Sequence, residues 1–86
     1  MRQVRLPDSC DIRNVSQLHA LLVDALSSGD QVEVDGSAVA RCDTAAGQLF
    51  VSAARDPHVH WRLSDTLRAQ LGEAHLPLML FREDAP

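Results

Sequence analysis

The sequence contains no lysine and no tyrosine, and aromatic residues make up only 3% of its 86 residues. The 8 basic side chains are therefore all arginines, and they face 12 acidic side chains, for a formal net charge of −4. A mildly acidic chain is a poor nucleic-acid binder, because neutralising phosphates needs a basic face. The composition argues against a nucleic-acid partner.

Long hydrophobic runs are also missing. The apolar runs are far shorter than the roughly 20 residues that a membrane-spanning helix needs. The stretch before residue 12 carries charges at Arg2, Arg5, Asp8 and Asp11 and has no apolar core, unlike a secretory signal peptide. We therefore expect a cytoplasmic protein without direct membrane insertion.

Metal-ligating residues are few. Cys10 and Cys42 lie far apart in the chain and fit no ligand spacing, so we expect reduced packing residues. His58 and His60 would share one face of a strand, but only Asp56 stands near them as a third ligand. We predict no metal site and no cofactor.

The length and overall composition indicate one small globular domain. We predict a single domain over residues 1–86, with an ordered core at about 4–81. The hydrophobic share of 45% and charged share of 23% are typical of folded proteins. A domain of this size leaves little room for a deep active-site cavity.

Strand and helix patterns alternate from the start of the chain. Residues 4–6 predict a short strand, and residues 10–12 a second one that pairs with it as a hairpin. Asn14 is a predicted helix N-cap, with Gln17 in a capping-box position and apolar residues following at helical spacing. Gly29 suits the end of that helix.

The alternation continues through the second half. Residues 31–35 predict a strand, 43–56 a helix begun by Asp43 and Thr44, 59–61 a strand, and Ser64 caps a third helix. Leu78–Phe81 is either a last strand or an apolar tail on the sheet. The order predicts an α/β fold, a mixed four- to five-stranded sheet with three main helices packed on it.

Residues 35–46 carry the most specific pattern of the chain. Its fixed positions are Asp35, Ser37, Val39, Asp43, Thr44, Ala45 and Ala46. In this spacing the chain resembles the STAS domain (sulphate transporter and anti-sigma factor antagonist), whose pattern runs Asp-Leu-Ser-x-Val-x-x-Ile-Asp-Ser/Thr-Ser/Ala-Gly/Ala-Leu. The resemblance covers nearly the whole chain and implies a stand-alone STAS-like domain.

Three positions depart from the family pattern. Gly36 replaces an aliphatic residue, Cys42 replaces isoleucine or valine, and Gly47 replaces leucine. A glycine inside a helix costs about 1 kcal/mol of helix propensity. At Gly47 we expect a small cavity or a shifted helix start.

The resemblance implies that Thr44 is the residue that a partner kinase phosphorylates in the family's anti-sigma factor antagonists. The physical argument is separate. A helix start offers unpaired N–H groups and a partial positive charge, and a phosphate there adds about −1.5 to −2 charge. The alternative is that Thr44 only caps the helix. Ser37 is a second, weaker acceptor candidate.

The expected partner-binding surface surrounds this helix start. Its predicted members are Asp35, Ser37, Arg41, Asp43, Thr44, Ala45 and Gln48. Asp43 is interpreted foremost as the N-cap, and Asp35 as an acceptor that holds the following turn. Arg41 either neutralises a nearby phosphate or is simply solvated.

No catalytic triad order, paired catalytic carboxylates or phosphate-cradling glycine loop is present, so we predict that the protein is not an enzyme. The leading hypothesis is a monomeric or weakly dimeric regulator that binds an anti-sigma factor or related serine/threonine kinase. The first rival is an accessory subunit on the ATPase of a phospholipid ABC transporter. A signalling adaptor, for example of the chemotaxis type, is a close variant. A small enzyme or ligand-binding domain would need a polar pocket lined by His58 and His60.

Overall fold

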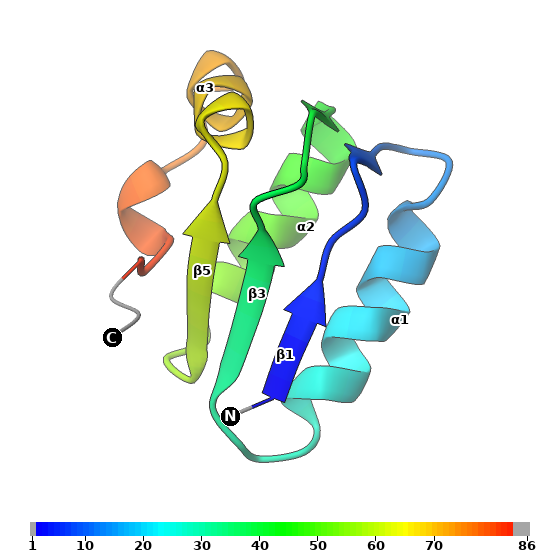
Figure 1. Cartoon of the computed structure of the whole chain (residues 1–86), viewed down its shortest axis with the longest axis vertical. Helices are drawn as coiled ribbons and strands as arrows, with labels where there is room; N and C mark the ends of the chain where they lie inside the picture. Colours follow the sequence, from blue (N-terminus) through cyan, green and yellow to red (C-terminus); the bar gives the residue numbers. More distant parts are fainter. Residues whose placement is uncertain (1, 84–86) are drawn as a thin grey trace.

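The computed structural model describes residues 2–83 and alternates strands with helices (Figure 1). The elements are β1 (Arg2–Arg5), β2 (Ser9–Cys10), α1 (Val15–Leu26), β3 (Val32–Gly36), β4 (Arg41–Cys42), α2 (Thr44–Ala54), β5 (Val59–Leu63), α3 (Asp65–Glu73) and the 3₁₀ helix η1 (Leu78–Leu80). The α/β class and the three main helices are confirmed.

The strands form two separate sheets. β1, β3 and β5 make a parallel three-stranded sheet with β3 at its centre, and β2 pairs with β4 in a second, parallel sheet. The predicted hairpin of the first two strands is wrong. Pro7 favours extended backbone, and the Leu6 N–H continues the ladder by donating to the Asp35 carbonyl at 2.9 Å. The chain therefore runs forward into β2 instead of turning back.

The core lies between the three-stranded sheet and the helices α1 and α2, which cover the same face of that sheet (Figure 1). Its largest fully buried side chains include Trp61 and Phe50. The centroids of their rings lie 5.7 Å apart, and the ring planes are inclined by 60°. The opposite face is polar, because successive side chains of a strand point to opposite faces and the polar ones point away from the core. There Gln3 donates to Glu33 at 2.9 Å, and Arg62 lies 3.8 Å from the same carboxylate.

The segment after α3 packs as an apolar tail against β5, the second of the two predicted alternatives. The ring of Phe81 lies 4.8 Å from that of Trp61, edge to face, and Phe81 is buried. The backbone N–H of Trp61 donates to the Arg82 carbonyl at 2.6 Å. Glu83 accepts two hydrogen bonds from Arg68, at 2.6 and 2.7 Å, and so ties the tail to α3.

One of the predicted helix caps fails. Ser64 caps α3 by accepting the Leu67 N–H at 2.9 Å, as expected. Asn14 stands at the N-cap position of α1 but makes no capping hydrogen bond. Its side chain accepts from the Asp11 N–H and donates to the Ser9 carbonyl, both at 2.8 Å, and so closes the turn that precedes the helix.

Glycine serves the end of α1 as expected, although one position later than the usual site. The C-cap is Ser27, and Gly29 follows two residues on with a φ of 79°. That left-handed conformation favours glycine and turns the chain toward β3. Within residues 2–83, no helix is both long and apolar enough to cross a membrane.

Candidate functional site

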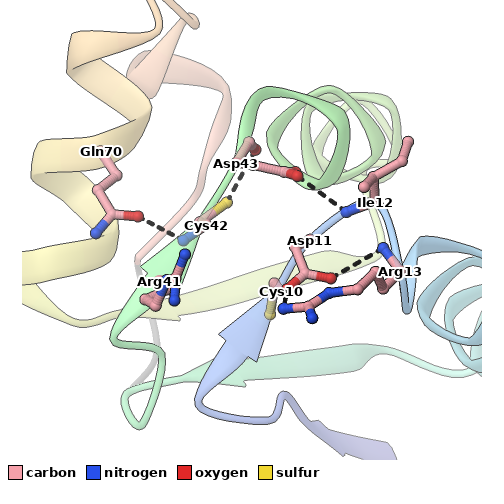
Figure 2. Close-up of a pocket in the computed structure, with 8 residues that line it drawn as sticks. All are labelled: Cys10, Asp11, Ile12, Arg13, Arg41, Cys42, Asp43 and Gln70. Carbon is pink, nitrogen blue, oxygen red and sulfur yellow. Dashed lines mark hydrogen bonds and ion pairs between the residues drawn. The ribbon is translucent and has the colours of Figure 1, made fainter.

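Two adjoining pockets open where β4 passes into α2. The first, of about 430 Å³, is lined by Cys10, Asp11, Ile12, Arg13, Arg41, Cys42, Asp43 and Gln70 (Figure 2). The second, of about 390 Å³, is lined by Cys42, Asp43, Thr44, Gln70, Glu73 and Ala74. Because they share Cys42, Asp43 and Gln70, we treat them as one surface and name these eleven residues the α2 groove.

Asp43 holds the start of α2 with both carboxylate oxygens. Oδ1 accepts the Ala46 N–H at 3.0 Å, which is the N-cap bond that the sequence predicts. Oδ2 accepts the Ile12 N–H at 2.9 Å, so the loop after β2 is fastened to the same carboxylate (Figure 2). One side chain therefore fixes two walls of the α2 groove.

Thr44 is the first residue of α2 and is exposed. Its hydroxyl makes no hydrogen bond with any residue between 2 and 83, and it borders the second pocket together with Glu73. The capping role that the sequence left open for Thr44 belongs to Asp43. Thr44 is thus exposed, and within residues 2–83 its hydroxyl has no hydrogen-bond partner.

The two pockets of the groove differ in their charged side chains. The first pocket carries Arg13 and Arg41, whereas the second carries Glu73 and no arginine. Arg13 lies 3.3 Å from Asp11, and its backbone N–H is the main cause of the lowered pKa of that carboxyl. Arg41 is exposed and lines the first pocket (Figure 2), whereas Thr44 lines the second.

Gln70 of α3 completes the groove by pairing with β4. Its Nε2 donates to the Ala40 carbonyl at 3.1 Å, and its Oε1 accepts the Cys42 N–H. The side-chain amide therefore binds the open edge of β4 much as a neighbouring strand would. Sequence reasoning missed Gln70, Glu73 and the Asp11–Arg13 loop, because no local pattern sets them apart from ordinary surface residues.

The two cysteines are adjacent in space despite their distance in the chain. Cys10 and Cys42 are register partners in the β2–β4 pair, and both are free thiols. Burial raises the pKa of the Cys10 thiol to about 11 and that of the Cys42 thiol to about 12. Both thiols are accordingly protonated at neutral pH.

At Gly36 and Gly47, the two glycines that depart from the family pattern, a neighbouring leucine occupies the space that a larger side chain would take. A Cβ at Gly47 would lie 2.6 Å from Leu76 Cδ1, and one at Gly36 would lie 2.8 Å from Leu67 Cδ2. The expected cavity or shifted helix start at Gly47 is therefore wrong. Leu76 occupies the space of the missing side chain, and α2 begins at Thr44.

Asp35 and Ser37 form a turn of their own outside the groove. The Ser37 hydroxyl and N–H donate to Asp35 Oδ1 at 2.6 and 3.0 Å. These bonds, the hydroxyl's foremost, hold the pKa of Asp35 below its usual range. Asp35 thus holds the turn as predicted, but it is 8% exposed, so little of it is available to a partner. Ser37 is exposed.

The remaining predicted contact residues, Ala45 and Gln48, do not line the groove. Gln48 is exposed and lies four residues after Thr44 on α2, so both occupy one helix face. Ala45 is half-buried. The predicted surface therefore extends from the groove along the outer side of α2.

His58 and His60 lie away from the α2 groove. His58 Nδ1 is 3.1 Å from Asp56 Oδ1, and His60 Nε2 is 2.8 Å from Gln31 Oε1. Between residues 2 and 83, no three His, Cys, Asp or Glu side chains are grouped as metal ligands would be.

A protein-family model described as "Mlab, STAS domain" matches residues 2–76. The chain belongs to the STAS domain family. The match runs from β1 to beyond the end of α3, so it includes every residue of the α2 groove. STAS domains are generally non-catalytic modules that mediate protein–protein interactions. A search of curated proteins and a search of solved structures each gave no significant match for this STAS domain.

Proposed function

We propose that this STAS domain is a non-enzymatic cytoplasmic regulator that binds a protein partner through the α2 groove, as anti-sigma factor antagonists of the family do. One observation carries the proposal. Thr44 presents an accessible hydroxyl at the first residue of α2, while Asp43 holds the helix start rigidly from both carboxylate oxygens. Arg41 contributes to this surface from within the groove, and Ala45 and Gln48 extend it along α2.

Phosphorylation of Thr44 would then act as the switch. A phosphate adds about −1.5 to −2 charge at neutral pH. It would stand beside Asp43 and near Glu73, in the pocket without an arginine. The amino end of α2 offsets only part of that charge, so the groove surface becomes strongly negative and the partner binds more weakly.

The direct test incubates the protein with a candidate anti-sigma factor kinase of its source organism and Mg-ATP, then maps phosphate by mass spectrometry. We expect a gain of about 80 Da on the peptide containing Thr44. We also expect Thr44→Glu to weaken kinase binding about tenfold or more, a change of about 1.4 kcal/mol or more.

Thr66→Glu is the matched control, because Thr66 is also exposed near the amino end of a helix, α3. That variant should bind the kinase as the wild type does. Absence of phosphate from Thr44, together with unchanged binding of Thr44→Glu, would refute the proposal.

A second candidate is an accessory subunit that docks on the ATPase of a phospholipid ABC transporter without phosphorylation. The acidic second pocket favours it, because Asp43 and Glu73 oppose a phosphate at Thr44 and no arginine there compensates. Stable co-purification with the ATPase subunit, unaffected by kinase and Mg-ATP, would select this candidate. A chemotaxis-type adaptor would use the same surface and would be recognised by its own kinase.

A further inference from the structure

Cys10 and Cys42 stand directly opposite each other where β2 pairs with β4. Neighbouring strands lie about 4.8 Å apart, and side chains of register partners point to the same face. A disulfide spans Cα separations of roughly 4.4–6.8 Å. The backbone therefore already holds the two cysteines at a separation that a disulfide can bridge.

Each thiol makes one weak hydrogen bond, and Cys42 is the more exposed of the two cysteines. The Cys10 thiol donates to the Pro7 carbonyl at 3.7 Å, and the Cys42 thiol to the Asp43 carbonyl at 3.6 Å. Rotation about the Cα–Cβ bonds to bring the two sulfurs together would break these weak S–H hydrogen bonds. Cys10 is fully buried, whereas Cys42 is half-buried. Cys42 borders both pockets of the α2 groove, and Figure 2 shows it in the first.

We propose that Cys10 and Cys42 form a reversible intramolecular disulfide when the protein meets hydrogen peroxide, locking β2 to β4 at the base of the α2 groove. This goes beyond the proposed function, because the disulfide needs no partner protein. It would make the groove sensitive to oxidation.

The reaction starts at Cys42, the accessible thiol. Its thiolate attacks one peroxide oxygen, the O–O bond breaks, and the released hydroxide combines with the thiol proton as water. The Cys10 thiolate then attacks the sulfur of the Cys42 sulfenic acid, the S–O bond breaks, and hydroxide leaves with the Cys10 proton as a second water. The thiols lose two electrons and two protons in total, and one peroxide becomes two waters.

The surroundings predict a slow reaction that accelerates with pH. Burial raises the pKa of Cys42 to about 12 and that of Cys10 to about 11, so few thiolates exist at neutral pH. The rate should rise about tenfold for each pH unit below those values. The disulfide should therefore form during sustained exposure to peroxide and not during brief pulses.

The crosslink would act on the groove through the loop that follows Cys10. That loop is already fastened to α2 by the bond from the Ile12 N–H to Asp43. A covalent link between β2 and β4 restricts the openings that break this bond. The Ile12 amide should therefore exchange its hydrogen more slowly after oxidation.

The test treats the full chain with hydrogen peroxide under non-reducing conditions. We expect a protein that stays monomeric, a tryptic peptide pair joined through Cys10 and Cys42 that is about 2 Da lighter than the two reduced peptides together, slower exchange at Ile12, and reversal by dithiothreitol. The mass is read on these peptides because peroxide also adds oxygen to the exposed Met79. The loop closed by the bond predicts a rise in Tm of roughly 15–30 °C.

Two variants provide the controls. Cys10→Ala should lose the mass change of 2 Da and instead accumulate sulfinic acid at Cys42, about 32 Da heavier. In Cys42→Ala the Cys10 thiol should stay reduced, because it is buried. Sulfinic acid at Cys42 of the wild type with Cys10 still reduced, or disulfide-linked dimers in place of the monomer, would overturn the proposal. The wild-type peptide map decides even if a variant folds poorly, and it involves neither kinase nor ATPase.

Discussion

Leu76 Cδ1 lies 2.6 Å from the point at which a side chain on Gly47 would begin. Leu76, the third residue after the end of α3, thus supplies the apolar volume that the family pattern places on α2 itself. The exchange matters for the groove, because Gly47 lies one turn after Asp43 and Thr44. A Cβ there would also lie 4.0 Å from Cys42 Sγ.

The first prediction tests that exchange. Gly47→Leu should destabilise the protein by about 1–3 kcal/mol, because the added side chain overpacks the site. In a Leu76→Ala background the same substitution should cost much less, since the space is vacated. Denaturant unfolding of the four proteins measures the coupling between the two positions. An equal cost in both backgrounds would mean that Leu76 does not fill this space.

The second prediction concerns the cap. Asp43→Ala should lower the free energy of unfolding by about 1–2 kcal/mol, because the N–H groups of Ala46 and Ile12 lose their acceptor. Asp43→Asn should retain most of the stability, since an amide oxygen also caps well.

Asp65→Ala is the control for the cap, because Asp65 is a fully exposed acid in the first turn of α3. Its removal should change stability by no more than about 0.5 kcal/mol. Similar losses for Asp43→Ala and Asp65→Ala in thermal unfolding would rule out a special role for the Asp43 carboxylate.

The third prediction is a pH dependence. The hydrogen bonds from Ser37 lower the pKa of Asp35 in the folded state. The stability that they contribute is fully present above the unfolded pKa of about 3.9 and is lost as pH falls through the lowered folded value. Ser37→Ala should raise the Asp35 pKa, which a carboxyl NMR titration measures directly.

The stability gap between wild type and Ser37→Ala should therefore be constant from neutral pH down to about 4 and narrow below that. A gap that persists unchanged at pH 2 would show that Ser37 acts without regard to the charge of Asp35.

The fourth prediction concerns the tail. Phe81→Ala should destabilise the protein by about 3 kcal/mol or more, because Phe81 is buried and packs on Trp61. Met79→Ala should have little effect, since Met79 is 89% exposed two residues earlier. Urea unfolding followed by the fluorescence of the single tryptophan reports on both. Equal midpoints for the two variants would contradict the packing role of Phe81.

The features that the sequence predicts well depend on neighbouring residues alone. The sequence predicts Asp43 as a cap because its carboxylate accepts an N–H only three residues on, and the turn at Asp35 and Ser37 is equally local. Asn14 has the same preference for the N-cap position, yet its side chain makes two hydrogen bonds within the preceding turn instead of capping α1. Local patterns cannot decide between two sets of partners for one side chain.

The features that could not be predicted depend on pairing between distant segments. The division into two sheets places Cys10 beside Cys42 and Ser9 beside Arg41, and no spacing in the chain encodes that register. Gln70 likewise looks like any polar residue on a helix surface, and only the position of α3 against β4 gives its amide a role. The contribution of α3 to the α2 groove is therefore visible only in the structure.

The most direct measurement of the central claim is amide hydrogen exchange of this STAS domain, alone and with whichever candidate partner binds, the anti-sigma factor kinase or the transporter ATPase. Partner binding through the α2 groove predicts slower exchange at residues 11–13 and 41–48. It predicts no change on the polar sheet face around Gln3, Glu33 and Arg62. Protection confined to that sheet face, with residues 41–48 exchanging as in the free protein, would contradict the account.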